Sequence, residues 1–355
     1  MRDPWNDAEL IRRFRAHSRI SLPRAPLNSA LCAIIADDPT LHSLLAHAPA
    51  TQQTPVLLLA AIHDRVLREP DHPLADWYPN LSTLPRSPDD SALASTLTEF
   101  VHERGPAILD VLATRRVQTN EVGRCALFVP AFALVADEVG PLAHLDVGTS
   151  AGLTTLWPHF SYRYDDGDRV GEGTPLIRCH TRGRGPLPVA IPAVATTVGL
   201  DVDPLDPTDA DDARWLQACC WPDQTDRFER LSAAIATAAE HPPTVVTGDA
   251  LAQLDELVVR AAETGHPTIT TSWVMNYLPP LDRRRFVDRL DELGSTLDLS
   301  WVIAESPAQT PELSHPTDLA DEHITALTLI TWRSGMRTAL TLATCHPHGY
   351  WLHWR

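Results

Sequence analysis

The chain has 355 residues, 44% of them hydrophobic, which is enough for one large globular domain or two ordinary ones. Its formal net charge of −17 argues against nucleic acid as a partner, because a polyanion would be repelled. The first residues show no basic stretch followed by an apolar core, so no secretory signal is expected. The longest apolar run, 125–136, contains Pro130 and falls short of the roughly 18 residues that a membrane span needs. We therefore expect a soluble, cytoplasmic protein with neither a membrane nor nucleic acid as a partner.

The cysteines give no sign of a metal site. Six occur, at positions 32, 125, 179, 219, 220 and 345. They form no C-x-x-C pair and no spacing typical of zinc ligands. We expect reduced, mostly buried thiols and no bound metal.

The first third of the chain has a helical pattern. Asn6 followed three residues later by Glu9 is a capping pair for a first helix, and the later segments carry apolar residues at three- and four-residue spacing. Helices are expected at 7–17, 27–46, 54–67 and 91–112, and a strongly apolar helix at 120–139 is expected to lie against a sheet. The sequence predicts an all-helical region over 1–118 that caps the site and selects the substrate.

Short strand-like segments begin after residue 140. Strands are expected at 143–147, 196–202, 244–248, 268–274, 301–305, 327–332 and 338–344, with 350–354 as a candidate continuation. Helices are expected between several of them, at 152–160, 224–239, 251–264 and 282–293. This alternation is typical of an α/β fold with a doubly wound, mainly parallel sheet.

Two further features complete the expected second domain, 119–355. Residues 333–337 are too few for a parallel crossover, so the last two strands should form an antiparallel hairpin. Residues 161–192 form an insertion between the first helix and the second strand, and Tyr162–Tyr164 before Asp165–Gly167 predicts a hairpin at its start. A five-strand parallel core closed by a terminal hairpin is the arrangement of class I methyltransferases.

The segment Leu145–Leu153, LDVGTSAGL, has two interpretations. A strand that ends in an acid and leads through a glycine turn into a helix resembles the first motif of class I methyltransferases, whose loop holds S-adenosylmethionine. The part Gly148–Gly152 also matches G-x-S-x-G, the nucleophile elbow of α/β-hydrolases, with Ser150 as the nucleophile. The two interpretations imply unrelated chemistries.

Acids at three successive strand ends favour the methyltransferase. Asp146 is suited to contact the amino-acid end of the cofactor or to orient the loop, Asp201 to accept both ribose hydroxyls, and Asp249 to accept from the adenine amino group. Ligands of such sheets bind where the strand order reverses, and glycines allow close backbone approach. The separation of Asp146 and Asp201 exceeds the usual ~20 residues, and the insertion accounts for the excess. The predicted cofactor-binding residues are Asp146, Gly148, Ser150, Gly152, Asp201 and Asp249.

Two other enzyme classes fit less well. A hydrolase would use Ser150, Glu305 and one of the histidines His346 and His348, which satisfies the order of a triad. The upstream region, however, has no oxyanion loop, and the elbow would follow the first strand. A nicotinamide-dependent oxidoreductase needs G-x-G-x-x-G, whereas the turn here is G-T-S-A-G.

Several blocks together resemble a bacterial family of unknown function. They are Arg116–Arg124, Asp146–Leu153, Trp221–Gln224 with Arg227 and Arg230, and His346–Gly349. The family's members, common in actinobacteria, are similar to class I methyltransferases in their sheet domain, and the resemblance covers nearly the whole chain. It implies the fold rather than an activity. This chain departs from the pattern in having Asp146 where the acid is often Glu, and Thr154 where Asn usually follows the turn.

Candidate catalytic groups lie at the end of the fourth strand and near the carboxyl terminus. Methyl transfer from a sulfonium requires positioning and, for a hydroxyl or protonated amine, a base. Asn276 and Tyr277 stand where such enzymes contact the acceptor, although a packed strand end explains them equally well. His346 and His348 are candidate bases, whereas a bare H-x-H is a weak metal signal and packed or surface histidines are the simpler explanation.

A polar cluster at the start of the helix 120–139 needs partners, because that helix is otherwise apolar. An internal pair of Glu121 with Arg124 is one explanation, and a position over the cofactor or acceptor is the other. In the block 221–224 we expect Asp223 to cap the helix that follows it. The predicted substrate-facing residues are Gln118, Asn120, Glu121, Arg124, Trp221 and Gln224.

The sequence therefore predicts an S-adenosylmethionine-dependent methyltransferase that acts on a small molecule or metabolite. The main alternative is a catalytically silent cofactor-binding protein of the same fold. The acceptor atom and the oligomeric state stay open.

Overall fold

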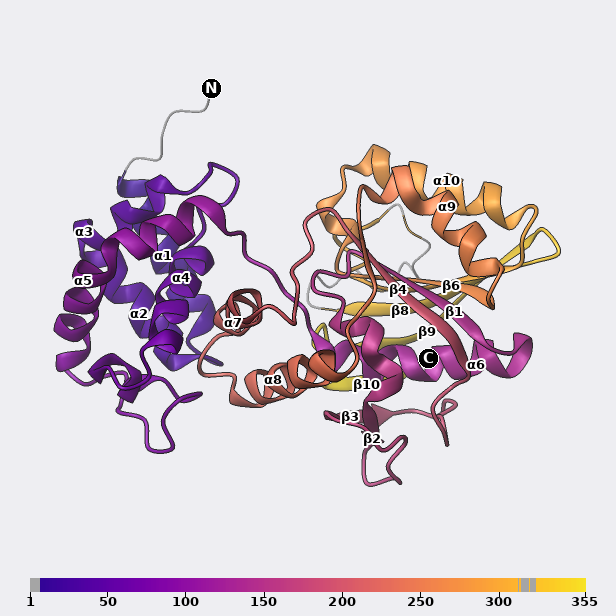
Figure 1. Ribbon diagram of the computed structural model, residues 1–355, viewed down its shortest axis with the longest axis horizontal. Helices are drawn as coiled ribbons and strands as arrows, with labels where there is room; N and C mark the ends of the chain where they lie inside the picture. The colour runs from indigo at the N-terminus through magenta and orange to yellow at the C-terminus, as the bar shows by residue number, and fades with distance from the viewer. Residues whose placement is uncertain (1–6, 312, 314–318, 320–323) are drawn as a thin grey trace. The chain divides into compact units, whose positions relative to one another are not determined.

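A computed structural model describes residues 7–311, 313, 319 and 324–355 (Figure 1). The chain forms two compact units. The helical unit contains the described residues of Met1–Thr119 together with Asp209–Ser232. The sheet unit contains those of Asn120–Thr208 and Ala233–Arg355.

The helical unit is built from helices of varied length around an aromatic core. Its elements are α1 (Asp7–Ser21), α2 (Pro26–Asp37), α3 (Pro39–His42), η1 (Ser43–His47), α4 (Pro55–Arg68), η2 (Pro73–Trp77), α5 (Ala92–Thr114), α7 (Ala210–Ala218) and the first half of α8 (Thr225–Glu240). Phe14, Trp77, Phe100 and Trp215 are completely buried in it. The predicted helix 27–46 is three elements, because Pro39 cannot continue α2 and Asp38 instead accepts the Thr40 N–H to cap α3.

The helix α2 begins with a cap supplied from far along the chain. Its N-cap residue, Ala25, has no side-chain acceptor. The carboxylate of Asp223 accepts the N–H groups of Leu27 at 2.8 Å and Asn28 at 3.0 Å. The expectation that Asp223 caps the helix following it was therefore wrong, because α8 starts at Thr225 and the acid turns to α2. Asp223 ties two sequence-distant parts of the helical unit together.

The sheet unit contains one ten-stranded sheet in the order β2-β3-β10-β9-β8-β7-β6-β1-β4-β5. The strands are β1 (Leu142–Val147), β2 (Ser161–Tyr164), β3 (Leu176–Arg182), β4 (Val194–Asp201), β5 (Val245–Thr247), β6 (His266–Ser272), β7 (Leu299–Glu305), β8 (Thr325–Arg333), β9 (Met336–Cys345) and β10 (Trp351–Trp354). Strands β5, β4, β1, β6 and β7 are all parallel, and β7, β8 and β9 are successively antiparallel. The predicted α/β sheet, its five-strand parallel core and the terminal hairpin are confirmed.

One edge of the sheet extends beyond a simple doubly wound fold. β10 is a separate strand that runs antiparallel to β9, not a continuation of it. The insertion supplies β2 and β3, which pair in parallel with each other, and β3 pairs in parallel with β10. The predicted hairpin survives only as an isolated antiparallel bridge between Tyr162 and Val170. The insertion thus builds one edge of the sheet.

Helices cover both faces of the sheet (Figure 1). α9 (Ala250–Ala262) and α10 (Pro280–Gly294) pack on the face that carries Leu145, Val147 and Trp301. α6 (Cys125–Val139), preceded by the turn η3 (Val122–Arg124), lies on the other face with η4 (Leu153–His159). Successive residues of a strand face opposite ways, so His144 and Asp146 point toward α6 and η4.

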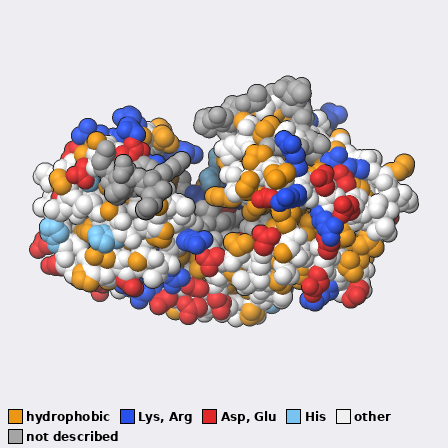
Figure 2. Space-filling view, turned by 90° about the horizontal axis from the view of Figure 1, so that it is seen from above, with side chains coloured by type: hydrophobic (Ala, Val, Ile, Leu, Met, Phe, Trp, Pro, Cys, Tyr) orange, Lys and Arg blue, Asp and Glu red, His pale blue; other side chains and the backbone are white. Residues whose placement is uncertain are grey.

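The outer surface of α9 and α10 mixes both signs of charge. Figure 2 shows arginines and acidic side chains intermingled on the face of the sheet unit turned to the viewer. Arg289 pairs with Asp255, and Arg260 with Glu256. This face therefore lacks the continuous basic stripe that binds a nucleic-acid backbone. Among the helices that the structure describes, none is both long and apolar enough to cross a membrane.

We expect Asp223→Ala to destabilise the helical unit by about 1–2 kcal/mol, because two α2 amides lose their cap. Urea unfolding followed by circular dichroism measures this loss. Asp226→Ala is the matched control, since Asp226 lies in the first turn of α8 on the exposed surface. Equal shifts of the unfolding midpoint in the two variants would contradict the assigned role of Asp223.

Candidate functional site

The order of the strands marks where a ligand binds such a sheet. The chain moves from β1 outward to β4 and β5, then crosses back to β6 on the other side of β1. Open α/β sheets bind ligands beyond the carboxyl ends of their strands at this reversal. The candidate site is therefore the edge formed by the residues that follow β1, β4, β5, β6 and β7.

Asp146 is the buried anchor of the loop that follows β1. It is 4% exposed, and its Oδ2 accepts the hydroxyls of Thr149, at 2.8 Å, and Thr154. Its Oδ1 accepts the hydroxyl of Thr270 at 2.6 Å. Its three hydroxyl donors come from the glycine loop itself, from η4 and from β6, so the carboxylate orients the loop. Thr154, the departure from the family pattern noted above, is one of these donors.

A histidine extends this network beneath the loop. Trp157 donates its indole N–H to Nδ1 of His144 at 3.3 Å, so the His144 proton lies on Nε2, which is 2.9 Å from Thr270 Oγ1. Burial lowers the pKa of His144 to about 4, so the ring is neutral near pH 7. The donors and acceptors therefore form one chain, in which Trp157 donates to His144, His144 to Thr270, and Thr270 to Asp146.

Four backbone N–H groups of the glycine loop donate within the protein. Gly148 and Thr149 donate to the carbonyl of Leu200, and Gly152 donates to that of Thr149. Ser150 donates its N–H to Oδ2 of Asp201 at 2.7 Å. These amides are not arranged as a phosphate cradle, which is what a dinucleotide requires at this turn.

The backbone conformation and the close packing of the loop require glycine at both positions, independently of any ligand. Gly148 and Gly152 have φ near +75°, where side chains are strained. A Cβ on Gly148 would collide with the side chain of Val274, and one on Gly152 with Val245 and Pro243. Ser150 also has a positive φ, 58°, and is 4% exposed. The contact of these residues with a cofactor stays a prediction.

Asn120 clamps the loop from the start of the sheet unit. Its Nδ2 donates to the carbonyl of Thr149 at 3.0 Å, and its Oδ1 accepts the N–H of Leu153 at 2.9 Å. One amide side chain therefore holds both ends of the turn. The predicted contact of Asn120 with a substrate stays a prediction.

Glu121 and Arg124 join the loop region to the carboxyl-terminal turn. Glu121 is 4% exposed, accepts the N–H of Gly123, and lies 3.0 Å from Nδ1 of His348. Arg124 donates to the carbonyl of Pro347 at 2.8 Å and to that of Ser272 at 2.9 Å. The two residues thus connect the end of β6 with the turn that carries both histidines.

The turn of His346 and His348 packs closely against η3. Nδ1 of His346 accepts the N–H of His348, and the His346 ring meets that of Tyr350 edge-on at 4.9 Å. A Cβ on Gly349 would collide with the backbone of Gly123. His348 and Glu121 form an acid–histidine pair, whereas Glu305, the acid considered for a hydrolase triad, is turned toward backbone amides.

The segment after β6 carries the predicted acceptor-facing residues. β6 ends at Ser272, and Trp273 follows with a φ of 56° and its indole hydrogen-bonded to Thr325. Asn276 lies in the turn η5 (Met275–Tyr277), and its Oδ1 is buried with no hydrogen-bond partner among the described residues. Tyr277 is 81% exposed. The two neighbours therefore differ, with Asn276 turned inward and Tyr277 outward.

Glu305, at the end of β7, is the residue that sequence reasoning undervalued. It is completely buried, and its Oε1 accepts the N–H groups of Val274 at 3.0 Å and Met275 at 3.1 Å. Burial raises its pKa to about 7, although these amides and the charges of Arg124 and Arg283 oppose the rise. The available signal in the sequence was an acid as the last residue of the predicted strand 301–305.

Asp201 and Asp249 lie where the sequence places them, and each also has a local partner. Asp201 aligns with Thr247 in the register of β4 and β5, one position beyond the pair of Val147 and Leu200. Its oxygens accept the N–H groups of Ser150 and Asp203. Asp249 is exposed and caps α9 through Ala252. Both carboxylates retain lone pairs for a ligand.

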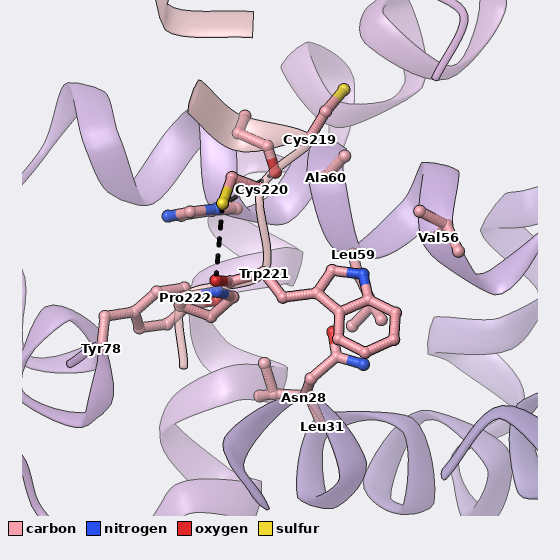
Figure 3. Close-up of a pocket in the computed structure, with 12 residues that line it drawn as sticks. Asn28, Leu31, Val56, Leu59, Ala60, Tyr78, Cys219, Cys220, Trp221 and Pro222 are labelled. Atoms are coloured by element: carbon pink, nitrogen blue, oxygen red, sulfur yellow. Dashed lines mark hydrogen bonds between the residues drawn. The ribbon is translucent and has the colours of Figure 1, made fainter. Parts of the chain in front are cut away.

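Three of the predicted substrate-facing residues belong to the helical unit. They are Gln118, Trp221 and Gln224. Trp221 lines a small cavity of about 10 Å³, close to the space one water occupies, together with His63 and Tyr78 (Figure 3). The carbonyl of Trp221 accepts from Cys220 at 3.9 Å, its ring meets His17 edge-on, and Gln224 accepts from Arg227. These contacts place the block 221–224 in the packing of the helical unit.

The described residues contain no group of three or more His, Cys, Asp and Glu side chains that could hold a metal ion. The arrangement instead offers carboxylates and buried polar side chains at one edge of the sheet. It suits an organic ligand with several hydrogen-bonding groups.

Comparison with known proteins identifies a family. A family model described as "Uncharacterized protein conserved in bacteria" matches residues 12–354, nearly the whole chain, so the chain belongs to this family. No curated protein and no solved structure matched.

The buried carboxyl of Glu305 makes a pH-dependent contribution to stability. Its pKa is about 7 in the native state against an ordinary value of 4.5, so between these values the unfolded chain loses the proton first. The contribution is therefore fully present below about pH 4.5 and is lost as the pH rises through 7, on the order of 3 kcal/mol in total. We expect the unfolding free energy of the wild type, relative to Glu305→Gln, to fall over this interval. Urea unfolding at a series of pH values measures it, and a constant difference from pH 4 to pH 8 would refute the assignment.

Proposed function

We propose that this member of the bacterial family is an S-adenosylmethionine-dependent methyltransferase that acts on a small molecule. The observation that carries the proposal is the meeting of a glycine loop and three aspartates at the point where the strand order reverses. Asp146 is near the end of β1, Asp201 is the last residue of β4, and Asp249 comes shortly after β5. These three strands are parallel neighbours. Ligand groups lying across these ends meet Asp201 and Asp249, while Asp146 holds the glycine loop through Thr149 and Thr154.

Charge supports a sulfonium cofactor over a dinucleotide. S-adenosylmethionine carries a positive sulfonium and a positive ammonium, whereas a dinucleotide brings a negatively charged pyrophosphate. An edge of carboxylates attracts the first and repels the second. The commitment of the loop amides of Gly148, Ser150 and Gly152 within the protein points the same way.

We assign each acid a role that its present contacts allow. Asp201 uses one lone pair of each oxygen for Ser150 and Asp203, and the remaining lone pairs suit the two ribose hydroxyls. Asp249 is exposed beyond β5 and suits the adenine amino group. Asp146 is buried among three hydroxyls, so we assign it to orienting the loop.

Methyl transfer is a displacement at carbon, and the protein contributes mainly position. The cofactor supplies the electrophilic methyl group. The segment after β6, held by Arg124 and Glu305, places Asn276 beside the acceptor. The hydrolase is less well supported, because Ser150 is 4% exposed and Glu305 holds the amides of Val274 and Met275.

Calorimetry with S-adenosylhomocysteine tests the proposal. We expect the wild type to bind and Asp201→Asn to bind about tenfold more weakly, because the loss of a charge-assisted hydrogen bond costs roughly 1.5 kcal/mol. Asparagine keeps one acceptor oxygen, which can serve the Ser150 amide of the loop, whereas the Asp203 amide loses its acceptor. Asp288→Asn, on the exposed face of α10, is the matched control.

Two outcomes decide against the proposal in different ways. Absence of binding by the wild type at millimolar ligand would remove the cofactor. Binding of S-adenosylmethionine without turnover over a broad set of small hydroxyl and amine compounds would favour the catalytically silent cofactor-binding protein.

A further inference from the structure

Four buried polar atoms gather at the adjoining ends of β6 and β7. They are Oγ of Ser272, Oδ1 of Asn276, Oε2 of Glu305 and Oγ of Ser306, and none has a hydrogen-bond partner among the described residues. The two strands are parallel neighbours, with Ser272 opposite Ala304, so their ends adjoin. Leaving a buried polar atom unpaired is unfavourable, because the atom has lost its hydrogen bonds to water without gaining a partner. A cluster of them is typical of a site that binds a polar group.

The carboxyl of Glu305 is fixed with one oxygen in use and one available. Oε1 accepts the amides of Val274 and Met275, which prevents rotation of the side chain. Glu305 is 0% exposed, and the neighbouring Ser306 is 1% exposed. Oε2 is therefore an acceptor held in a defined direction and screened from bulk water.

Two arginines place positive charge along the segment that follows β6. Arg124 donates to the carbonyl of Ser272 at 2.9 Å. Arg283, which is 7% exposed, donates to the carbonyls of Met275 at 3.3 Å and Leu278 at 3.1 Å. Both charges favour an oxygen that becomes negative and disfavour a permanent ammonium group. They distinguish a hydroxyl acceptor from a protonated amine.

We propose that this cluster is the acceptor subsite, that the methyl acceptor is a hydroxyl group of a small molecule, and that Oε2 of Glu305 takes its proton. The proposal rests on the proposed methyltransferase function and names its substrate class. Oδ1 of Asn276 accepts a second O–H or N–H donor of the same molecule and so fixes its orientation.

The reaction balances with the cofactor as the co-reactant. The O–H bond of the acceptor breaks and its proton passes to Glu305. The electron pair of that oxygen forms the new O–CH₃ bond while the S–CH₃ bond breaks and its pair stays on sulfur. The products are a methyl ether, S-adenosylhomocysteine and protonated Glu305, which returns its proton to water. Burial raises the pKa of Glu305 to about 7, which is the range in which a general base is effective at neutral pH.

Chromogenic probes test the subsite separately from the cofactor. The probes are 4-nitrophenol, whose absorbance distinguishes the phenol from the phenolate, and 4-nitroanisole, which lacks the O–H group. We expect the wild type to bind the phenol at least tenfold more tightly than the ether, with a change toward the phenolate spectrum. Each titration is made with and without S-adenosylhomocysteine.

Variants identify the proton acceptor. Glu305→Gln keeps an oxygen for the two amides but places an NH₂ group where Oε2 lies, so we expect the spectral change to disappear and the preference for the phenol to fall at least tenfold. Glu305→Asp tests for partial rescue. Glu256→Gln, on the exposed outer face of α9, is the matched control and should behave as the wild type.

The outcomes separate the two proposals. Equal binding of phenol and ether by the wild type, or an unchanged spectrum in a folded Glu305→Gln, would overturn the hydroxyl subsite even if S-adenosylhomocysteine binds. Tighter, Glu305-dependent binding of benzylamine than of 4-nitrophenol would also overturn it, in favour of an amine acceptor. Failure of S-adenosylhomocysteine to bind would remove the methyltransferase function while the phenol titration still reports on the subsite.

Discussion

The close packing of Val274 against Gly148 is the constraint on which the candidate site depends. The loop after β1 approaches the segment after β6 so closely that any side chain at residue 148 would collide with Val274. Glu305 holds the amide of Val274 in that place, and Arg124 holds the carbonyl of Ser272 two residues earlier. The glycine loop, the segment after β6 and the end of β7 are therefore packed together, and a change in any one of them moves the other two.

Polar side chains of the sheet unit hold these three packed segments in place. Asp146 gathers three hydroxyls, and the neutral His144 orients one of them. Asn120 and Asp201 each form hydrogen bonds with the backbone of the loop. Such a preorganised edge suits chemistry in which position contributes most of the rate. It also means that several residues that resemble ligand contacts in the sequence have protein partners.

Much of the fold was accessible from the sequence because local signals were strong. Alternating apolar segments and helices gave the five parallel strands, and the short link 333–337 gave the antiparallel hairpin. The sequence could not show where the insertion goes, because pairing of β3 with β10 depends on contacts between residues far apart in the chain. The cap that Asp223 supplies to α2 was hidden for the same reason. At the site, Asp146 and Asp201 became candidates through their position at strand ends, and Asn120 through its place in a polar cluster at the start of an apolar helix. The importance of Glu305 follows from burial and from the amides it accepts.

The most direct test of the account is a crystal structure determined after soaking with S-adenosylhomocysteine. The account predicts density for the ligand beyond the carboxyl ends of β1 and β4, with the ribose hydroxyls on Asp201 and the sulfur directed toward the segment after β6. Well-ordered crystals that show this edge without the ligand, or the ligand bound elsewhere on the protein, would contradict it.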